Sequence, residues 1–226
     1  MSITLALDIY GTLFDPEAIK TSLQAHMGNK SGNFAQSWRA KQLEYTFRRG
    51  LMGTYSDFAK VTHAALEFTC KLYDIEISQD EKNALMDKYQ ALDTFPDVAP
   101  ALTQLEQKGA KLHAFSNGVA QDISKLLLHA GLDNTISSIV SSQEVQTFKP
   151  DPRFYNHFID QAQTTPSSTW LVSSNPFDII GAAACGWQTV WVQRNPSTVF
   201  DPWEEAPTVV VSKLTELPQI AALWER

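Results

Sequence analysis

From about residue 95 onward, short apolar runs alternate with helical patterns, and this alternation constrains the fold more than any other feature. Two of the candidate helices stop at Gly109 and Gly131, and glycine commonly follows the last turn of a helix. A strand pattern follows each of them. Such alternation predicts a parallel sheet with helices on both faces, so we expect an α/β fold. The expected strands cover residues 3–7, 111–116, 136–142, 169–174 and 189–194, and the expected helices cover 99–109, 120–131, 151–163 and 176–186.

The segment between the first expected strand and the rest of the sheet has a different pattern. From Pro16 to about Tyr89 the stretches "SWRAKQLEYTFRRGLM", "SDFAKVTHAALEFTCKLY" and "SQDEKNALMDKY" carry apolar residues at helical spacing. Ser56 and Ser78 are suited to cap the second and third of these helices. We therefore predict a helical-bundle cap over residues 15–94, inserted into a core made of residues 1–14 and 95–226.

Composition excludes several classes of partner. The formal net charge of −7 and the pI near 5.2 disfavour binding to nucleic acid, which relies on clustered Lys and Arg. No apolar stretch reaches the roughly 20 residues that a membrane helix needs, and no signal-peptide pattern opens the chain. Cys70 and Cys185 lie far apart without a metal-binding spacing. We expect a cytoplasmic protein with no nucleic-acid or membrane partner.

Polar residues stand where the expected strands end. Asp8 ends the first strand, Ser116 the second and Ser173 the fourth, while Lys149 follows the third. Ligands of open α/β sheets bind at the carboxyl ends of the strands, so these side chains should meet at one rim. Each has an ordinary alternative, such as Asp8 capping a turn or Lys149 being solvated before Pro150. Their shared position at strand ends favours catalysis.

Five stretches together carry a resemblance to a known family: "LDIYGTLFD", "WRAKQLEYTFRRGLMGTYSDF", "FSNG", "FKPDPRFY" and "LVSSNPFDIIGA". The chain resembles the haloacid dehalogenase superfamily, and within it the L-2-haloacid dehalogenases, over nearly its whole length. The resemblance implies a Rossmann-like core, a helical cap and an aspartate that attacks carbon. It also implies a homodimer formed through the cap helices.

The implied reaction is hydrolysis of short L-2-haloalkanoic acids to D-2-hydroxy acids with inversion, through an ester on Asp8, with water as co-substrate and halide as product. Phosphatases of the superfamily hold Mg²⁺ with a second aspartate and a further carboxylate, but here Tyr10 and Ser174–Asn175 stand at those places. Fewer carboxylates weaken a site for a hard cation. Halide leaves without a proton, so no general acid is needed at position 10. We expect neither a metal nor another cofactor.

Site residues follow from the same resemblance. The implied catalytic residues are Asp8, Thr12, Lys149, Tyr155, Ser173, Asn175 and Asp178, and the implied substrate or halide contacts are Tyr10, Arg39, Leu43, Phe58, Ser116, Asn117 and Phe177. In this reading Asp8 is the nucleophile, Lys149 keeps it ionised, Thr12 positions it, and Asn175 and Asp178 orient or activate water.

The substrate contacts are also implied. Ser116 and the amides after it receive the substrate carboxylate, while Arg39, Asn117 and Phe177 form a halide cradle. Tyr155, Ser173 and Tyr10 complete the polar shell. The family often has Gln after the cap arginine and Trp before the last aspartate. Here Ala40 and Phe177 stand there, which we expect to change the pocket more than the mechanism.

Two other functions stay open at this point. One is a phosphatase of the same superfamily, which would require metal and is disfavoured by Tyr10 and Ser174. The other is a catalytically inactive relative that binds a small anion, or binds a partner protein through its cap. The presence of every expected catalytic side chain disfavours that alternative.

Overall fold

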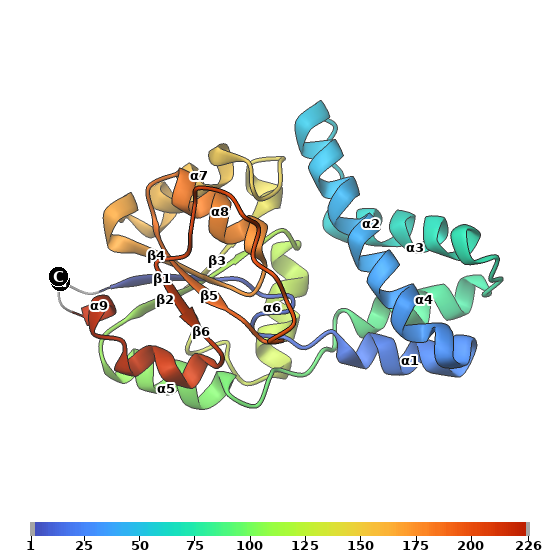
Figure 1. Cartoon of the computed structure of the whole chain (residues 1–226), viewed down its shortest axis with the longest axis horizontal. Coiled ribbons are helices and arrows are strands. Elements are labelled where there is room, and N and C mark those ends of the chain that lie inside the picture. Colours follow the sequence, from blue (N-terminus) through green and yellow to red (C-terminus); the bar gives the residue numbers. More distant parts are fainter. Residues whose placement is uncertain (1–2, 225–226) are drawn as a thin grey trace.

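A computed structural model describes residues 3–224 of the chain. Its core is a parallel sheet of six strands in the order β3-β2-β1-β4-β5-β6 (Figure 1). The strands are β1 Thr4–Leu7, β2 Lys111–Ser116, β3 Ser138–Ser141, β4 Thr169–Ser173, β5 Gln188–Val192 and β6 Val209–Val211. The predicted fold class, α/β with a parallel sheet, is confirmed. Of these strands, the sequence analysis missed the short edge strand β6.

Strand β1 lies at the centre of the sheet, where the strand order reverses. Leu7 pairs with Ala114 of β2 on one side and with Val172 of β4 on the other. Since all the strands are parallel, the residues after Leu7, Ser116 and Ser173 emerge at the same edge. This is the position at which open α/β sheets bind their ligands.

Helices cover both faces of the sheet because strand side chains alternate in direction. Leu5 and Leu7 belong to one buried apolar cluster, whereas Ala6 belongs to another with Phe154 and Ile179. Helices α7 and α8 lie on one face and α5 on the opposite face (Figure 1). The helices of the core are α5 Val98–Gln107, α6 Ala120–His129, α7 Pro152–Ala162, α8 Pro176–Ala184 and α9 Ala221–Trp224, with 3₁₀ turns η2 Ser142–Glu144, η3 Pro166–Ser168 and η4 Leu214–Gln219.

Four helices form a cap beside the core (Figure 1). They are α1 Glu17–Met27, α2 Ser31–Met52, α3 Phe58–Tyr73 and α4 Gln79–Lys88, with a 3₁₀ turn η1 Gly28–Lys30. Trp38 and Leu66 of the cap belong to the same apolar cluster as Leu5 and Leu7 of β1. The cap and one face of the sheet therefore share a continuous buried core.

The two segments that connect cap and core run side by side. The Asp15 amide donates to the Asp93 carbonyl at 2.9 Å, and the Phe95 amide donates to the Leu13 carbonyl at 3.0 Å. This pairing is compatible with the expected division into residues 1–14 with 95–226 and residues 15–94. The division itself stays a prediction, and its outermost residues 1–2 and 225–226 lie outside the described part of the chain.

The two predicted helix caps had different outcomes. Ser78 caps α4 as predicted, and the Glu81 carboxylate accepts in return from the Ser78 amide at 2.7 Å. The prediction for Ser56 is wrong, because α3 begins at Phe58 and Asp57 is its cap. The Asp57 carboxylate accepts from the Lys60 amide at 2.8 Å, where the helix dipole also favours a negative charge.

Helix α2 is the longest helix that the structure describes, with 22 residues. Charged residues such as Arg39, Lys41 and Glu44 interrupt its apolar positions. Among residues 3–224, no helix combines the length and the apolar character needed to cross a membrane.

Candidate active site

Asp8 occupies the first position after β1, at the carboxyl edge of the sheet. Its amide extends the strand ladder by donating to the Val172 carbonyl at 3.0 Å, and the residue is only 5% exposed. Oδ2 accepts from Thr12 Oγ1 at 2.7 Å and from Asn175 Nδ2 at 2.9 Å, whereas Oδ1 accepts from Lys149 Nζ at 2.8 Å. Oδ2 is thus held by several donors, and Oδ1 keeps a lone pair for chemistry.

The turn after β1 folds Thr12 back towards Asp8. Gly11 makes this turn with a φ of 82°, in the left-handed region that glycine adopts without strain. Thr12 Oγ1 donates to Asp8 and accepts from the Ser174 amide at 2.8 Å, so it links the ends of β1 and β4. This contact agrees with the predicted positioning of the nucleophile by Thr12.

Lys149 places a buried cation between two carboxylates. Its ammonium donates to Asp8 Oδ1 and to Asp178 Oδ2, each at 2.8 Å, and to the Phe115 carbonyl at 3.2 Å. Burial is the largest influence and opposes the charge, but the attraction of Asp178 and Asp8 outweighs it and raises the pKa of Lys149. The side chain is therefore a permanent cation with all three protons donated.

Asp178 is fully buried at the start of α8. Its Oδ2 accepts from Lys149 and from Ser173 Oγ at 2.9 Å, while its Oδ1 has no partner among the described residues. Burial, opposed by Lys149 and reinforced by the charge of Asp8, raises the pKa of Asp178 to about 6. A carboxylate with this pKa and an unpartnered oxygen is suited to take a proton from water near neutral pH.

A small cavity lies between these groups and the cap, with a volume of about 10 Å³. This is near the minimum that holds one water molecule. Its lining residues all belong to the predicted site: they are Asp8, Tyr10, Arg39, Leu43, Phe58, Ser116, Asn117, Lys149, Asn175, Phe177 and Asp178. The structure therefore brings together the strand ends and the cap residues, as the sequence analysis expected.

The remaining predicted residues, Thr12, Ser173 and Tyr155, are fully buried and lie outside this lining. The expectation that Tyr155 and Ser173 complete the polar shell stays a prediction. The Tyr155 hydroxyl donates to the main-chain carbonyl of Asp178 at 3.1 Å. Gly181 makes this approach feasible, since a Cβ there would lie 2.5 Å from the Tyr155 hydroxyl oxygen. Tyr155 thus fixes the backbone that carries Asp178.

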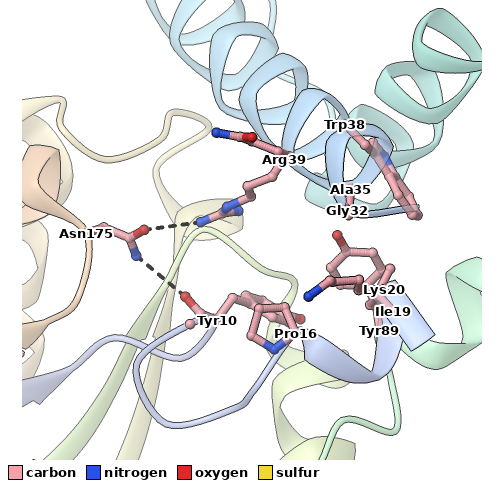
Figure 2. Close-up of a pocket in the computed structure, with 12 residues that line it drawn as sticks. Tyr10, Pro16, Ile19, Lys20, Gly32, Ala35, Trp38, Arg39, Tyr89 and Asn175 are labelled. Carbon is pink, nitrogen blue, oxygen red and sulfur yellow. Dashed lines mark hydrogen bonds between the residues drawn. The ribbon is translucent and has the colours of Figure 1, made fainter. Parts of the chain in front are cut away.

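Arg39 connects the cap to the core side of the site. Its Nη1 donates to Gln42 Oε1 at 2.5 Å. Its Nη2 lies 3.4 Å from Asn175 Oδ1, a long hydrogen bond that Figure 2 shows. Asn175 in turn donates to Asp8 Oδ2, so one chain of polar contacts runs from α2 to the nucleophile. Gln42 is fully buried and donates to Thr62 Oγ1 at 2.5 Å, which orients its carbonyl oxygen towards Arg39.

Aromatic rings close the cavity on the cap side. Phe177 meets Phe47 of α2 edge to face, with ring centroids 5.1 Å apart, and Tyr10 stacks on Phe58 at 5.5 Å. Burial, together with the charge of Asp122, raises the pKa of Tyr10, so its phenol stays neutral. Ala40 is exposed and does not line this cavity, and its expected effect on the pocket stays a prediction.

Two polar residues near the site were not predicted. Gln42 lies one helical turn after Arg39, a spacing at which side chains on a helix contact each other. Arg194 follows β5 and donates to the Thr12 carbonyl at 2.7 Å and to both carboxylate oxygens of Asp97. Applying the strand-end rule to β5 would have found Arg194, and helical spacing would have found Gln42.

The carboxylates of Asp8 and Asp178 both point at the ammonium of Lys149, not at a common position where a metal ion could bind. Among the described residues, no group of three or more His, Cys, Asp or Glu side chains gathers in a geometry that could hold a metal ion.

Comparison with known proteins assigns the chain to a family. The family model for haloacid dehalogenase-like hydrolases matches residues 4–186. The chain belongs to the haloacid dehalogenase-like hydrolases. Within this family, the (S)-2-haloacid dehalogenase of Pseudomonas sp. strain YL is 33% identical over 216 residues, covering 96% of this chain and 93% of the relative.

Two further relatives extend the comparison of this haloacid dehalogenase-like hydrolase. Haloacetate dehalogenase H-2 of Moraxella sp. strain B is 31% identical and covers 97% of both chains. The L-2-haloacid dehalogenase of Xanthobacter autotrophicus, solved with chloropropionic acid covalently bound, superposes with a TM-score of 0.90 at 29% identity, covering 97% of this chain and 98% of that one. The resemblance to the L-2-haloacid dehalogenases is thereby confirmed.

The buried charge arrangement gives a stability prediction. Lys149→Met leaves Asp8 and Asp178 without their cation, which we expect to cost about 3–5 kcal/mol of unfolding free energy. Without the opposing attraction of Lys149, the buried Asp178 carboxyl binds a proton more tightly in the folded state than in the unfolded chain. That contribution is present at low pH and is lost as the pH rises through the raised pKa of Asp178, so the loss should be smaller at pH 5 than at pH 8.

Urea unfolding at both pH values measures this difference. Lys125→Met is the matched control, because the Lys125 side chain is 51% exposed. Equal losses of stability for Lys149→Met at pH 5 and pH 8 would contradict the assignment of two uncompensated carboxylates.

Proposed function

We propose that this haloacid dehalogenase-like hydrolase is an (S)-2-haloacid dehalogenase, which converts short L-2-haloalkanoic acids to D-2-hydroxy acids. The observation that carries the proposal is a buried nucleophile, Asp8, with a free lone pair on Oδ1, facing a small cavity whose wall has the neutral Tyr10 in place of a carboxylic acid. The names of the relatives support the same substrate class.

The first half-reaction is displacement at carbon. The substrate carboxylate binds at Ser116, and the halogen points towards Arg39, Asn117 and Phe177 on the cavity wall. Asp8 Oδ1 attacks the α-carbon from the opposite face, the new C–O bond forms as the carbon–halogen bond breaks, and halide leaves with the bonding electron pair. Attack from the back inverts the carbon. Halide takes no proton, so a neutral phenol at position 10 suffices.

The second half-reaction is hydrolysis of the ester. Water donates a proton to Asp178 Oδ1, the oxygen without a partner among the described residues, and attacks Cγ of Asp8. The tetrahedral intermediate collapses with cleavage of the acyl C–O bond. The departing alkoxide receives the proton from Asp178 and becomes the hydroxy acid. The donors from Thr12 and Asn175 stabilise the negative oxygen while the intermediate exists.

Metal plays no part in this scheme. The site supplies its positive charge through Lys149 and Arg39, and no step requires a Lewis acid. A phosphatase of the same family is the alternative, and it would need Mg²⁺ for activity. The absence of nucleic-acid and membrane partners and the cytoplasmic location stay predictions from the sequence.

Halide release tests the proposed reaction. Purified protein in EDTA should release chloride from L-2-chloropropanoate and not from the D form, and Asp8→Ala should abolish release because it removes the nucleophile. Asp133→Ala, at an exposed aspartate, is the matched control and should keep full activity. If the protein releases chloride from neither enantiomer and hydrolyses a phosphate ester in the presence of Mg²⁺, the proposed function is wrong and the protein is a phosphatase.

The pKa of Asp178, about 6, predicts the pH dependence of the second step. In the ester the charge of Asp8 is gone, which removes one of the causes that raise this pKa, so the fall in rate should begin below pH 6. There the carboxylate is protonated and cannot accept a proton, and single-turnover hydrolysis of the ester should fall about tenfold per pH unit. Asp178→Asn should stop hydrolysis but allow attack, so mass spectrometry should find Asp8 alkylated. Steady turnover by Asp178→Asn would remove Asp178 from the role of base.

We also propose a homodimer formed through the cap, as the family resemblance implies. Large apolar side chains are exposed on α2 and α3, including Leu51 at 92% and Leu72 at 59%. Light scattering at micromolar concentration should give twice the mass of the chain, and Leu51→Glu with Leu72→Glu should shift it towards the monomer. Val199→Glu is the control: Val199 is an exposed apolar residue outside the cap, so this change should leave the mass unchanged. A monomeric wild type would rule the dimer out.

A further inference from the structure

A second pocket lies beside the catalytic cavity and is much larger, with a volume of about 340 Å³. We call it the cap-side pocket. It opens between the loop after β1 and helices α1 and α2 (Figure 2). Its apolar walls come from Pro16 and Ile19 on one side and from Gly32, Ala35 and Trp38 on the other. The volume lies in the range of pockets that bind small organic ligands.

The two cavities are adjacent. Tyr10, Arg39 and Asn175 line both of them, and Arg39 and Asn175 approach each other at the boundary only through the 3.4 Å contact. A hydrogen bond of that length is a weak barrier. The alkyl chain of a bound substrate can therefore pass from the catalytic cavity, beside Tyr10, into the cap-side pocket.

The catalytic cavity is small, so a 2-haloacid must displace lining side chains to bind there, and a bulky substituent needs space elsewhere. Its volume of about 10 Å³ is close to that of one water site, and bulky side chains surround it. Phe58 is 6% exposed and stacks on Tyr10, and Phe177 packs on Phe47. A pocket of only about 90 Å³, lined by Asp122, lies beyond Phe58, whereas the cap-side pocket offers about 340 Å³ next to Tyr10.

The walls of the cap-side pocket suit an apolar group. The indole N–H of Trp38 donates to the Thr62 carbonyl at 2.9 Å, and the Trp38 ring packs edge to face on Tyr89 with ring centroids 5.4 Å apart. These contacts fix the orientation of Trp38, so it presents an apolar ring surface to the pocket. Burial raises the pKa of Tyr89 to about 12, which keeps this phenol neutral. Small residues at Gly32 and Ala35 leave the space open.

We propose that the cap-side pocket binds the alkyl or aryl side chain of larger 2-haloalkanoic acids, and that Ala35 sets the upper limit on its size. This inference rests on the proposed function, since it names the substrate class of the same site. Burial of each added methylene should raise kcat/KM about fourfold until the pocket is filled. The enzyme should then act on 2-bromohexanoate and 2-bromooctanoate as well as on 2-chloropropanoate.

Filling the pocket tests the proposal. Ala35→Leu should lower kcat/KM for 2-bromooctanoate at least tenfold and leave that for 2-chloropropanoate within twofold. Ala40→Leu is the matched control, because it is the same substitution on the same helix at an exposed position. Gly32→Val, which fills the pocket from a neighbouring turn, should show the same selectivity if Ala35→Leu does not fold.

The outcomes separate this inference from the proposed function. Wild-type turnover of 2-chloropropanoate without turnover of the longer acids would overturn the pocket assignment and leave the dehalogenase in place. Equal effects of Ala35→Leu on short and long acids would overturn it as well. Wild type inactive on every 2-haloacid would overturn the proposed function, and the substrate class with it.

Discussion

The buried ammonium of Lys149 is the interaction on which the site depends. Two carboxylates lie in one closed crevice, where the repulsion between them would otherwise protonate one or separate them. Lys149 holds both at 2.8 Å and uses its third proton on the Phe115 carbonyl. This one cation lets Asp8, just after β1, and Asp178, at the start of α8, lie close together while differing in chemistry.

The difference between the carboxylates comes from their other partners. Asp8 has several donors on one oxygen and only Lys149 on the other, which leaves an ionised oxygen for attack on carbon. Asp178 is more deeply buried, has an oxygen without a partner among the described residues, and has a raised pKa. Neighbouring acids with different environments commonly divide the roles of nucleophile and base.

The cap completes the site through packing as well as through Arg39. Trp38 and Leu66 share a buried cluster with the central strand, so the cap cannot move away from the sheet without exposing apolar surface. Arg39 then reaches Asn175, and Asn175 holds Asp8. The closed position of the cap and the orientation of the nucleophile are therefore linked. Tyr10 lies at the boundary of the two cavities, where a long substrate would pass from one to the other.

The sequence by itself determined the parallel sheet and the residues that meet at its edge, since strand ends in a parallel sheet share one edge whatever the details of packing. Asp8, Ser116 and Lys149 could be predicted for this reason. The tertiary structure decided which side chains face the cavity. Tyr155 supports the backbone of Asp178 from behind, and Gln42 holds Arg39, because side-chain direction depends on contacts between segments far apart in the chain. The presence of a small and a large cavity side by side likewise depends on how the cap packs against the core, which no local pattern encodes.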